Sequence, residues 1–199
     1  MTATGWPVEL RGVTESIIAT LGPNDRYNFA ALGLHAPAEG IDPGSAETVR
    51  ARTWGRTRTW RNFTERGGGV VQFSRDPVLF TDAALDIYEQ DDPVHESAAA
   101  WVTVSVERTD EGTDGETQWV DWELTPEDAT AEYETFPAFN RGYAAVVEAT
   151  VAASRLDVEA YDTETLVERI EYFGEVVERC GGPREREAFG RIEAIVDEL

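Results

Sequence analysis

The hydrophobic pattern of the first 130 residues is that of β-strands. Residues 15–21 and 27–34 predict a hairpin, because the turn sequence Gly-Pro-Asn-Asp lies between them. Residues 47–54 predict a short strand, and residues 70–73 a buried one. Residues 101–106 and 119–124 alternate between apolar and polar side chains, and they predict a second hairpin around residues 110–116.

Helical periodicity dominates the last third of the chain. A helix is predicted earlier, from Asp76-Pro77 to about Tyr88, and three more follow Pro137. The first of these three helices covers residues 140 to about 156. The second is capped by Asp162 or Thr163, and the third begins at Pro183. Strands followed by helices predict an α+β chain with a domain at residues 1–130 and a helical subdomain at 131–199.

Small residues gather in the predicted strand at 27–34. Ala30, Ala31 and Gly33 lie within four consecutive residues, in the sequence YNFAALGL. Small side chains in a strand are typical of places where another flat body approaches the backbone. That body can be a planar ligand or simply another packed element, and this segment alone does not distinguish the two.

Charge is distributed unevenly in a way that the periodicity does not explain. The formal net charge is −22, with 17 Arg, no Lys and 39 acids. Six of the Arg lie between Arg50 and Arg66, where Glu65 is the only acid, so this window has a net charge of +5. Placing positive charges close together costs free energy unless a negatively charged group lies among them. The alternative is an Arg-rich face paired with acids from elsewhere in the chain.

Side chains in this window suit a phosphate group. Arg56 and Arg58 offer planar guanidinium groups, and Thr57 and Thr59 offer hydroxyls. Thr59 is expected to cap a helix that runs through Asn62 to about Arg66. A helix start with hydroxyls, free amides and Arg side chains is a typical anion site.

Composition limits the cellular setting. Hydrophobic residues make up 41% of the chain, and no apolar run approaches the length of a membrane span. No signal-peptide pattern is present, and Cys180 is alone, so a cytoplasmic protein is expected and Cys180 is interpreted as a buried apolar residue. Acid-rich chains without Lys look like those of salt-accumulating halophiles. The negative charge argues against a general affinity for nucleic acid.

Several common catalytic patterns are missing. His35 and His95 lack metal-ligand neighbours and are interpreted as exposed loop residues, so no metal site is expected. The loop at 110–116 resembles a calcium loop only in part and is interpreted as a turn. No nucleophile elbow or P-loop occurs, and no catalytic residue is nominated. If the protein is an enzyme, its reactive group is expected to come from a cofactor.

Five segments, in this order, resemble the archaeal domain-of-unknown-function family 447. They are residues 15–20, 27–34, 55–62, 70–80 and 139–156. The resemblance implies an antiparallel FMN-binding split β-barrel, similar to flavin reductases, followed by a C-terminal three-helix segment. It also implies a homodimer with FMN near the subunit interface.

The resemblance also implies where FMN would lie. Its phosphate would contact Thr57, Thr59 and the Arg56/Arg58 pair, and its ring would lie along the backbone from Asn28 to Leu32. The residues implied as cofactor-binding are Asn28, Ala30, Ala31, Arg56, Thr57, Arg58, Thr59, Asn62, Gln72, Asn140 and Arg141. Gln72 departs from the Asn that most relatives are expected to have.

Three functional hypotheses follow from these features. The first is an FMN-dependent oxidoreductase with NAD(P)H or a protein as electron donor. The second is a non-catalytic FMN-binding or carrier protein. The third is a single-stranded RNA module, because Trp54, Trp60 and Phe63 interleave with Arg in a way that suits base stacking. These aromatic residues are more simply interpreted as core.

Overall fold

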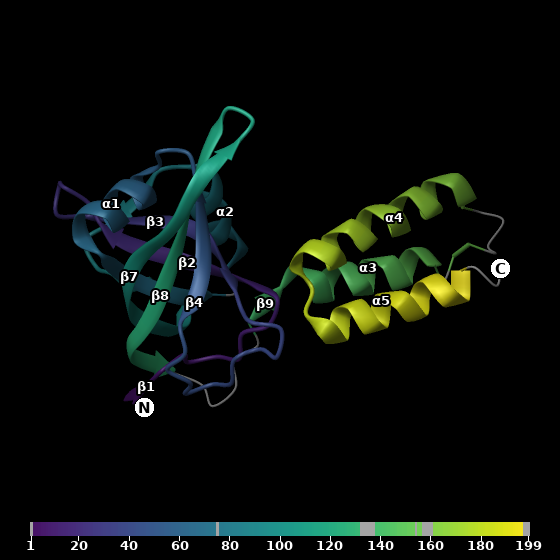
Figure 1. Cartoon of the computed structure of the whole chain (residues 1–199), viewed down its shortest axis with the longest axis horizontal. Helices are drawn as coiled ribbons and strands as arrows, with labels where there is room; N and C mark the ends of the chain where they lie inside the picture. The colour runs from purple at the N-terminus through teal and green to yellow at the C-terminus, as the bar shows by residue number, and fades with distance from the viewer. Residues whose placement is uncertain (1, 75, 132–137, 154, 157–160, 197–199) are drawn as a thin grey trace.

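The computed structural model describes the chain except for residues 1, 75, 132–137, 154, 157–160 and 197–199. The strands and helices fall into two parts, a barrel and a helical extension (Figure 1). The strands are β1 (Thr2–Thr4), β2 (Val13–Leu21), β3 (Tyr27–His35), β4 (Val49–Trp54), β5 (Gly68–Ser74), β6 (Tyr88–Gln90), β7 (Ala98–Asp114), β8 (Thr117–Ala131) and β9 (Phe139–Asn140). The helices are α1 (Arg58–Arg66), α2 (Pro77–Leu85), α3 (Arg141–Ala153), α4 (Thr163–Cys180) and α5 (Pro183–Val196).

Six antiparallel strands close into a barrel in the order β3-β4-β8-β7-β5-β2, and β2 pairs with β3 to complete the ring. Closure leaves these strands no free sheet edge along their paired length. The short strands β1, β6 and β9 add to β8, β3 and β2. The predicted α+β class and antiparallel barrel are confirmed, although β1, β6 and β9 were not predicted.

The barrel interior holds the main core. The side chains of Trp6, Phe63, Phe73 and Trp122 are each at most 2% exposed. Phe63 comes from α1, and its ring meets Trp122 edge to face with centroids 5.2 Å apart. Burying one such aromatic side chain stabilises the fold by about 2–3 kcal/mol. Phe63 therefore anchors α1 on the barrel.

A second cluster covers the outer face of β2 and β3. Ile17 and Ala19 of β2 and Phe29 of β3 pack there against Leu79 and Ala83 of α2. The helix predicted to reach Tyr88 ends earlier, because Tyr88 begins β6 and pairs with Phe29. Strand pairing thus overrides the helical periodicity at the end of this segment.

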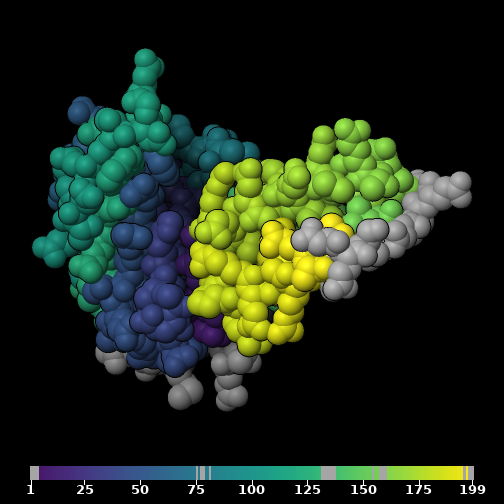
Figure 2. Space-filling model, turned by 45° about the vertical axis from the view of Figure 1, so that its right-hand side comes forward, coloured from purple at the N-terminus to yellow at the C-terminus, as the bar shows by residue number. Residues whose placement is uncertain are grey.

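The three C-terminal helices form a core of their own, built from Ala145, Ala149, Ile170, Val177 and Phe189 among others. Asp162 caps α4 by accepting from the amide of Thr165 at 2.9 Å, as predicted. Figure 2 shows this part projecting from the barrel. No described helix combines the length and apolar composition that a membrane span requires.

The helical part meets the barrel through close backbone contact. A Cβ on Gly142 would overlap the backbone of Gly181, and a Cβ on Gly12 would overlap the carbonyl of Cys180. Gly12 also has a φ of +53°, which side chains rarely adopt. Cys180 is buried at this junction, as interpreted from the sequence.

The interpretation of both histidines as exposed loop residues is wrong. His35 lies half-buried at the end of β3, where burial and the charge of Arg50 lower its pKa. His95 is also half-buried, since its ring lies edge-on to Phe29 and Tyr88. Neither is an exposed loop residue, because the barrel wall and the β6 region pack against them.

Candidate functional site

A pocket of about 410 Å³ lies where β3 and β4 separate. The two strands pair only at Leu34–Ala51 and His35–Arg50, while β6 pairs with β3 at residues 27–29. Between these pairings, residues 30–33 have no partner on this side of β3 among the described strands. The lining residues are Asn28, Phe29, Ala30, Ala31, Leu32, Arg52, Thr53, Trp54, Thr57, Arg58, Thr59, Ala83, Ala84, Asp86 and Ile87.

The wall formed by β3 is open because its side chains are small. Ala30 and Ala31 line the pocket and are partly exposed, whereas Phe29 and Leu32 on either side are buried. Ala30 also packs against the core inside the barrel, and the side chain of Ala31 points to the opposite face of the strand. The small residues therefore leave room for a ligand beside the backbone of β3.

The start of α1 forms the polar end of the pocket. Thr57, not Thr59, is the N-cap, and its hydroxyl accepts from the amide of Trp60 at 3.2 Å. Thr59 lies inside the first turn and is 4% exposed. The first amides of a helix have no partner within the helix, so this end favours an anion.

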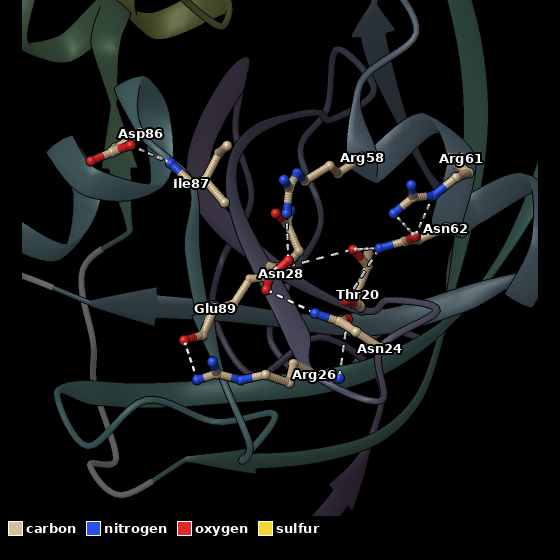
Figure 3. Close-up of polar contacts among 10 residues, drawn as sticks. All are labelled: Thr20, Asn24, Arg26, Asn28, Arg58, Arg61, Asn62, Asp86, Ile87 and Glu89. Atoms are coloured by element: carbon tan, nitrogen blue, oxygen red, sulfur yellow. Dashed lines mark hydrogen bonds and ion pairs between the residues drawn. The ribbon is translucent and has the colours of Figure 1, made fainter.

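Arg58 reaches across the site to an acid. Its Nη1 lies 2.5 Å from Oε1 of Glu89, which comes from β6, and Figure 3 shows the side chain extending from α1 toward that strand. Glu89 also accepts from Nδ2 of Asn24 at 3.0 Å. Arg58 therefore pairs with an acid from elsewhere in the chain, as the alternative interpretation of the Arg window expected.

Arg52 is held by a second acid. Its Nε and Nη2 donate to the two oxygens of Asp121 at 2.6 and 2.8 Å, and its guanidinium lies 3.9 Å from the ring centroid of Trp119. This pairing holds the pKa of the Asp121 carboxyl below its usual range. Arg56 is exposed beside Trp60 and lies 3.4 Å from Gln118 through Nε and Oε1.

Asn62 lies behind the pocket wall and does not line the pocket. It is 1% exposed, and its Nδ2 donates to Oγ1 of Thr20 at 3.0 Å. Thr20 in turn donates to the carbonyl of Asn28 at 3.5 Å, and Arg61 donates to Oδ1 of Asn62 at 3.4 Å (Figure 3). This chain of contacts fixes α1 relative to β2 and β3.

Gln72 lies on β5, does not line the pocket and is fully buried. Its Nε2 donates to the carbonyl of Pro93 at 3.3 Å, and its Oε1 accepts from the amide of His95 at 2.9 Å. The side chain therefore holds the segment after β6 against β5. In this chain its amide faces protein groups.

Asn140 and Arg141 lie at the junction of the barrel and the helical part. Asn140 caps α3 by accepting from the amide of Tyr143 at 3.1 Å, and it donates to the carbonyl of Arg11. Arg141 lies 3.7 Å from Glu15, whose pKa is raised by burial. Neither residue lines the pocket between β3 and β4.

The pocket therefore brings together six of the eleven residues singled out from the sequence: Asn28, Ala30, Ala31, Thr57, Arg58 and Thr59. Sequence reasoning missed the side formed by Trp54 and by residues 83–87. Trp54 was interpreted as core but is 47% exposed, because it lies on the outside of the barrel. Its position opposite β3 follows from the strand order, for which the local sequence carried no signal.

Two other chemistries fit the described residues poorly. No group of three or more His, Cys, Asp or Glu gathers there in a way that could hold a metal ion. Stacking of RNA bases would need exposed aromatic rings, but Phe63 is 2% exposed and Trp60 packs on the core, so of the three aromatic residues in the Arg window Trp54 alone presents an exposed ring.

The chain is similar to solved structures of an FMN-bound protein, a flavin reductase and a flavoredoxin. An FMN-bound protein of family DUF447 from Methanosarcina mazei is 25% identical, with a TM-score of 0.50, and the match covers 93% of this chain and 95% of that one. The flavin reductase of styrene monooxygenase from Pseudomonas putida S12 is 10% identical over 60% of this chain and 81% of its own, with a TM-score of 0.44. Flavoredoxin from Desulfovibrio vulgaris is 14% identical over 61% and 72%, with a TM-score of 0.42.

Family models agree over most of the chain. The model for the N-terminal domain of DUF447, described as a protein of unknown function, matches residues 14–133. The model for the C-terminal part of the same family matches residues 140–194. The chain therefore belongs to the DUF447 family.

Proposed function

We propose that this protein is an FMN-binding flavoprotein whose cofactor occupies the pocket between β3 and β4. The observation that carries the proposal is one pocket with an anion-favouring helix start at one end and small residues along its wall. The similarity to an FMN-bound relative over 93% of the chain supports FMN as the ligand. A volume of about 410 Å³ lies in the range of small-molecule sites.

The phosphate end of FMN would lie at the start of α1. Thr57 and Thr59 supply hydroxyls there, Arg58 supplies a guanidinium, and the first amides of the helix point toward the anion. Arg56 lies at the outer rim and adds positive charge. Arg52 keeps Asp121 as its partner and contributes to the shape of the wall.

The ring of FMN would lie against β3 from Asn28 to Leu32. Ala30 and Ala31 leave it space, and the exposed ring of Trp54 faces the same pocket from β4. Asn62 would act through Thr20, which contacts the backbone of Asn28, and Gln72 by holding the segment that carries His95. When bound, FMN would supply hydride or single-electron transfer.

We also propose a homodimer with FMN near the subunit interface. Asn140 and Arg141 lie away from the pocket of their own chain, so they would reach FMN only from the partner subunit. We propose that residues 1–130 form the flavin-binding barrel domain and residues 131–199 form a helical subdomain that packs on the barrel or on the partner subunit. Their boundary lies next to residues 132–137, which the structure does not describe.

We infer that the protein is a cytoplasmic oxidoreductase that accepts electrons from NAD(P)H or from a protein donor. The non-catalytic alternative, an FMN carrier, uses the same pocket. Addition of NAD(P)H to purified yellow protein under anaerobic conditions separates the two, because bleaching of the flavin absorbance requires transfer of a hydride or electrons to the bound FMN. A protein that stays yellow with NAD(P)H and with reduced ferredoxin-type donors is the carrier.

The FMN site is tested by comparing FMN with riboflavin, which lacks the phosphate. Arg58→Ala and Thr59→Ala should each weaken FMN about tenfold or more and riboflavin much less, because a charged hydrogen bond contributes roughly 1.5–3 kcal/mol. The control is Arg179→Ala, which removes an Arg from an ion pair on α4, far from the pocket. Equal losses of FMN and riboflavin affinity in these variants would show that α1 does not hold the phosphate. A wild-type protein that is colourless and binds neither flavin would refute the site.

A further inference from the structure

Trp54 lies across the gap between β3 and β4 from Ala31. The ladder between these strands ends at Leu34–Ala51, and continuing it in the same register would set Trp54 opposite Ala31. The strands separate instead, and both residues line the pocket. Burial alternates along β4, which places the ring of Trp54 on the outside of the barrel.

The pocket combines one exposed aromatic ring with several small side chains. Ala31 of β3 and Ala83 and Ala84 of α2 line it. Its two aromatic lining residues differ in exposure, because Phe29 is 1% exposed and Trp54 is 47% exposed. A large ring that shares a pocket with alanines leaves a slot suited to a flat ligand.

Neighbouring strands support the ring of Trp54 from behind. The guanidinium of Arg52 lies 5.6 Å from the ring centroid of Trp54 and 3.9 Å from that of Trp119. Asp121 fixes this guanidinium through two hydrogen bonds. Trp119 lies in turn against Gly112 of β7, where a Cβ would come within 2.6 Å of the ring. A ring restrained in this way loses little conformational entropy when a ligand stacks on it.

We infer that Trp54 stacks on the isoalloxazine ring of FMN, an assignment that rests on the proposed FMN site and adds a residue that binds the ring instead of the phosphate. Aromatic rings favour offset stacking, and a planar heterocycle offers an indole the required face. Trp54 precedes Thr57, the N-cap of α1, by three residues. One short segment would therefore present an aromatic ring to the isoalloxazine and a helix start to the phosphate.

The test compares FMN and riboflavin titrations of the full-length protein in molar KCl. Trp54→Ala should weaken both flavins by the same factor, roughly tenfold, because stacking involves the ring that they share. Trp54→Phe keeps an aromatic ring and should restore most of the affinity. Tyr172→Ala is the control, because it removes an exposed aromatic side chain from α4 and should change neither affinity. Circular dichroism verifies that each variant is folded.

Flavin fluorescence gives a second measurement that a merely structural role of Trp54 would not change. A stacked indole quenches an excited flavin by electron transfer, and a phenyl ring does not. At protein concentrations that bind all of the flavin, FMN should therefore fluoresce more strongly in Trp54→Ala and Trp54→Phe than in the wild-type protein.

Three results would count against the role of Trp54. Unchanged affinity for both flavins in Trp54→Ala would place the isoalloxazine away from this ring. A loss confined to FMN would show that Trp54 acts through the phosphate end. Both of these results would leave the FMN site standing, whereas a wild-type protein that binds neither flavin would overturn the proposed function and the role of Trp54 together.

Discussion

The contact between Arg58 and Glu89 shows how a single acid limits the proposed anion site. The guanidinium that would bind the FMN phosphate already has a carboxylate 2.5 Å away. Glu89 is held in place by Asn24 Nδ2, and its backbone carbonyl accepts from Arg26 at 2.8 Å. Phosphate must therefore compete with Glu89 for Arg58, or share it.

Removing this competitor should strengthen FMN binding. Glu89→Gln keeps the shape and loses the charge, so FMN should bind roughly two- to fivefold more tightly, the range expected for a partly exposed ion pair. Isothermal titration with FMN and with riboflavin measures the effect, which should be confined to FMN. Glu175→Gln removes the same charge from an ion pair on α4. A similar gain in that control would assign the effect to net charge alone.

At the level of elements, β4 is fastened to β8 by side chains as well as by its backbone. Arg52 pairs with Asp121, and Trp54 lies opposite Trp119 in the register. Inside the barrel, Nε1 of Trp122 donates to Oγ1 of Thr53 at 2.9 Å. These contacts hold β4 in place beyond its short pairing with β3, so the pocket stays open between the two strands.

The pH dependence of stability should report the Arg52–Asp121 pair. The pKa of Asp121 is depressed in the folded protein, so its stabilisation is complete above the unfolded value near 3.8 and is lost as the pH falls through the folded value. At pH 7, Asp121→Asn should lower the free energy of unfolding by about 1–3 kcal/mol, because Arg52 loses its charged partner. Denaturant titration measures this change. Below about pH 4 the difference should shrink. A difference that stays constant with pH would mean that packing, not charge, is lost.

At the level of the whole molecule, the charge is the dominant feature. Acids outnumber Arg by 22, so pairing every Arg with one acid would still leave a net charge of −22 on the molecule. Most of the acids that the structure describes lie on the surface, where they repel one another. At molar salt the screening length falls to about 3 Å, and this repulsion is largely removed.

Folding should therefore depend on salt. The melting temperature should climb steeply between dilute buffer and molar KCl, because screening stabilises the compact state relative to the unfolded chain. Differential scanning calorimetry across that range measures the change. A flat melting temperature would contradict the salt argument, and the acidic surface would then require a binding partner to explain it.

The sequence by itself determined the position of the positive window and most of the elements, but not the short strands β1, β6 and β9. Strand alternation, the turn after Leu21 and the caps of α4 and α5 are local features, and local sequence is sufficient for them because each depends on neighbours a few residues away. The resemblance based on ordered segments also led to the family. The small residues of β3 predicted an open wall, and Ala30 and Ala31 do line the pocket.

Only the tertiary structure decided which side chains face the pocket. Arg52 pairs with Asp121 and shapes the wall, whereas Arg58 pairs with Glu89 at the polar end of the pocket. Both acids lie far along the chain from the Arg window, so no pattern within that window could distinguish the two arginines. Gln72 faces the Pro93–His95 segment and Asn140 faces Arg11 for the same reason. Burial and pairing over long sequence distances are set by the order of strands around the barrel, and the local sequence does not encode that order.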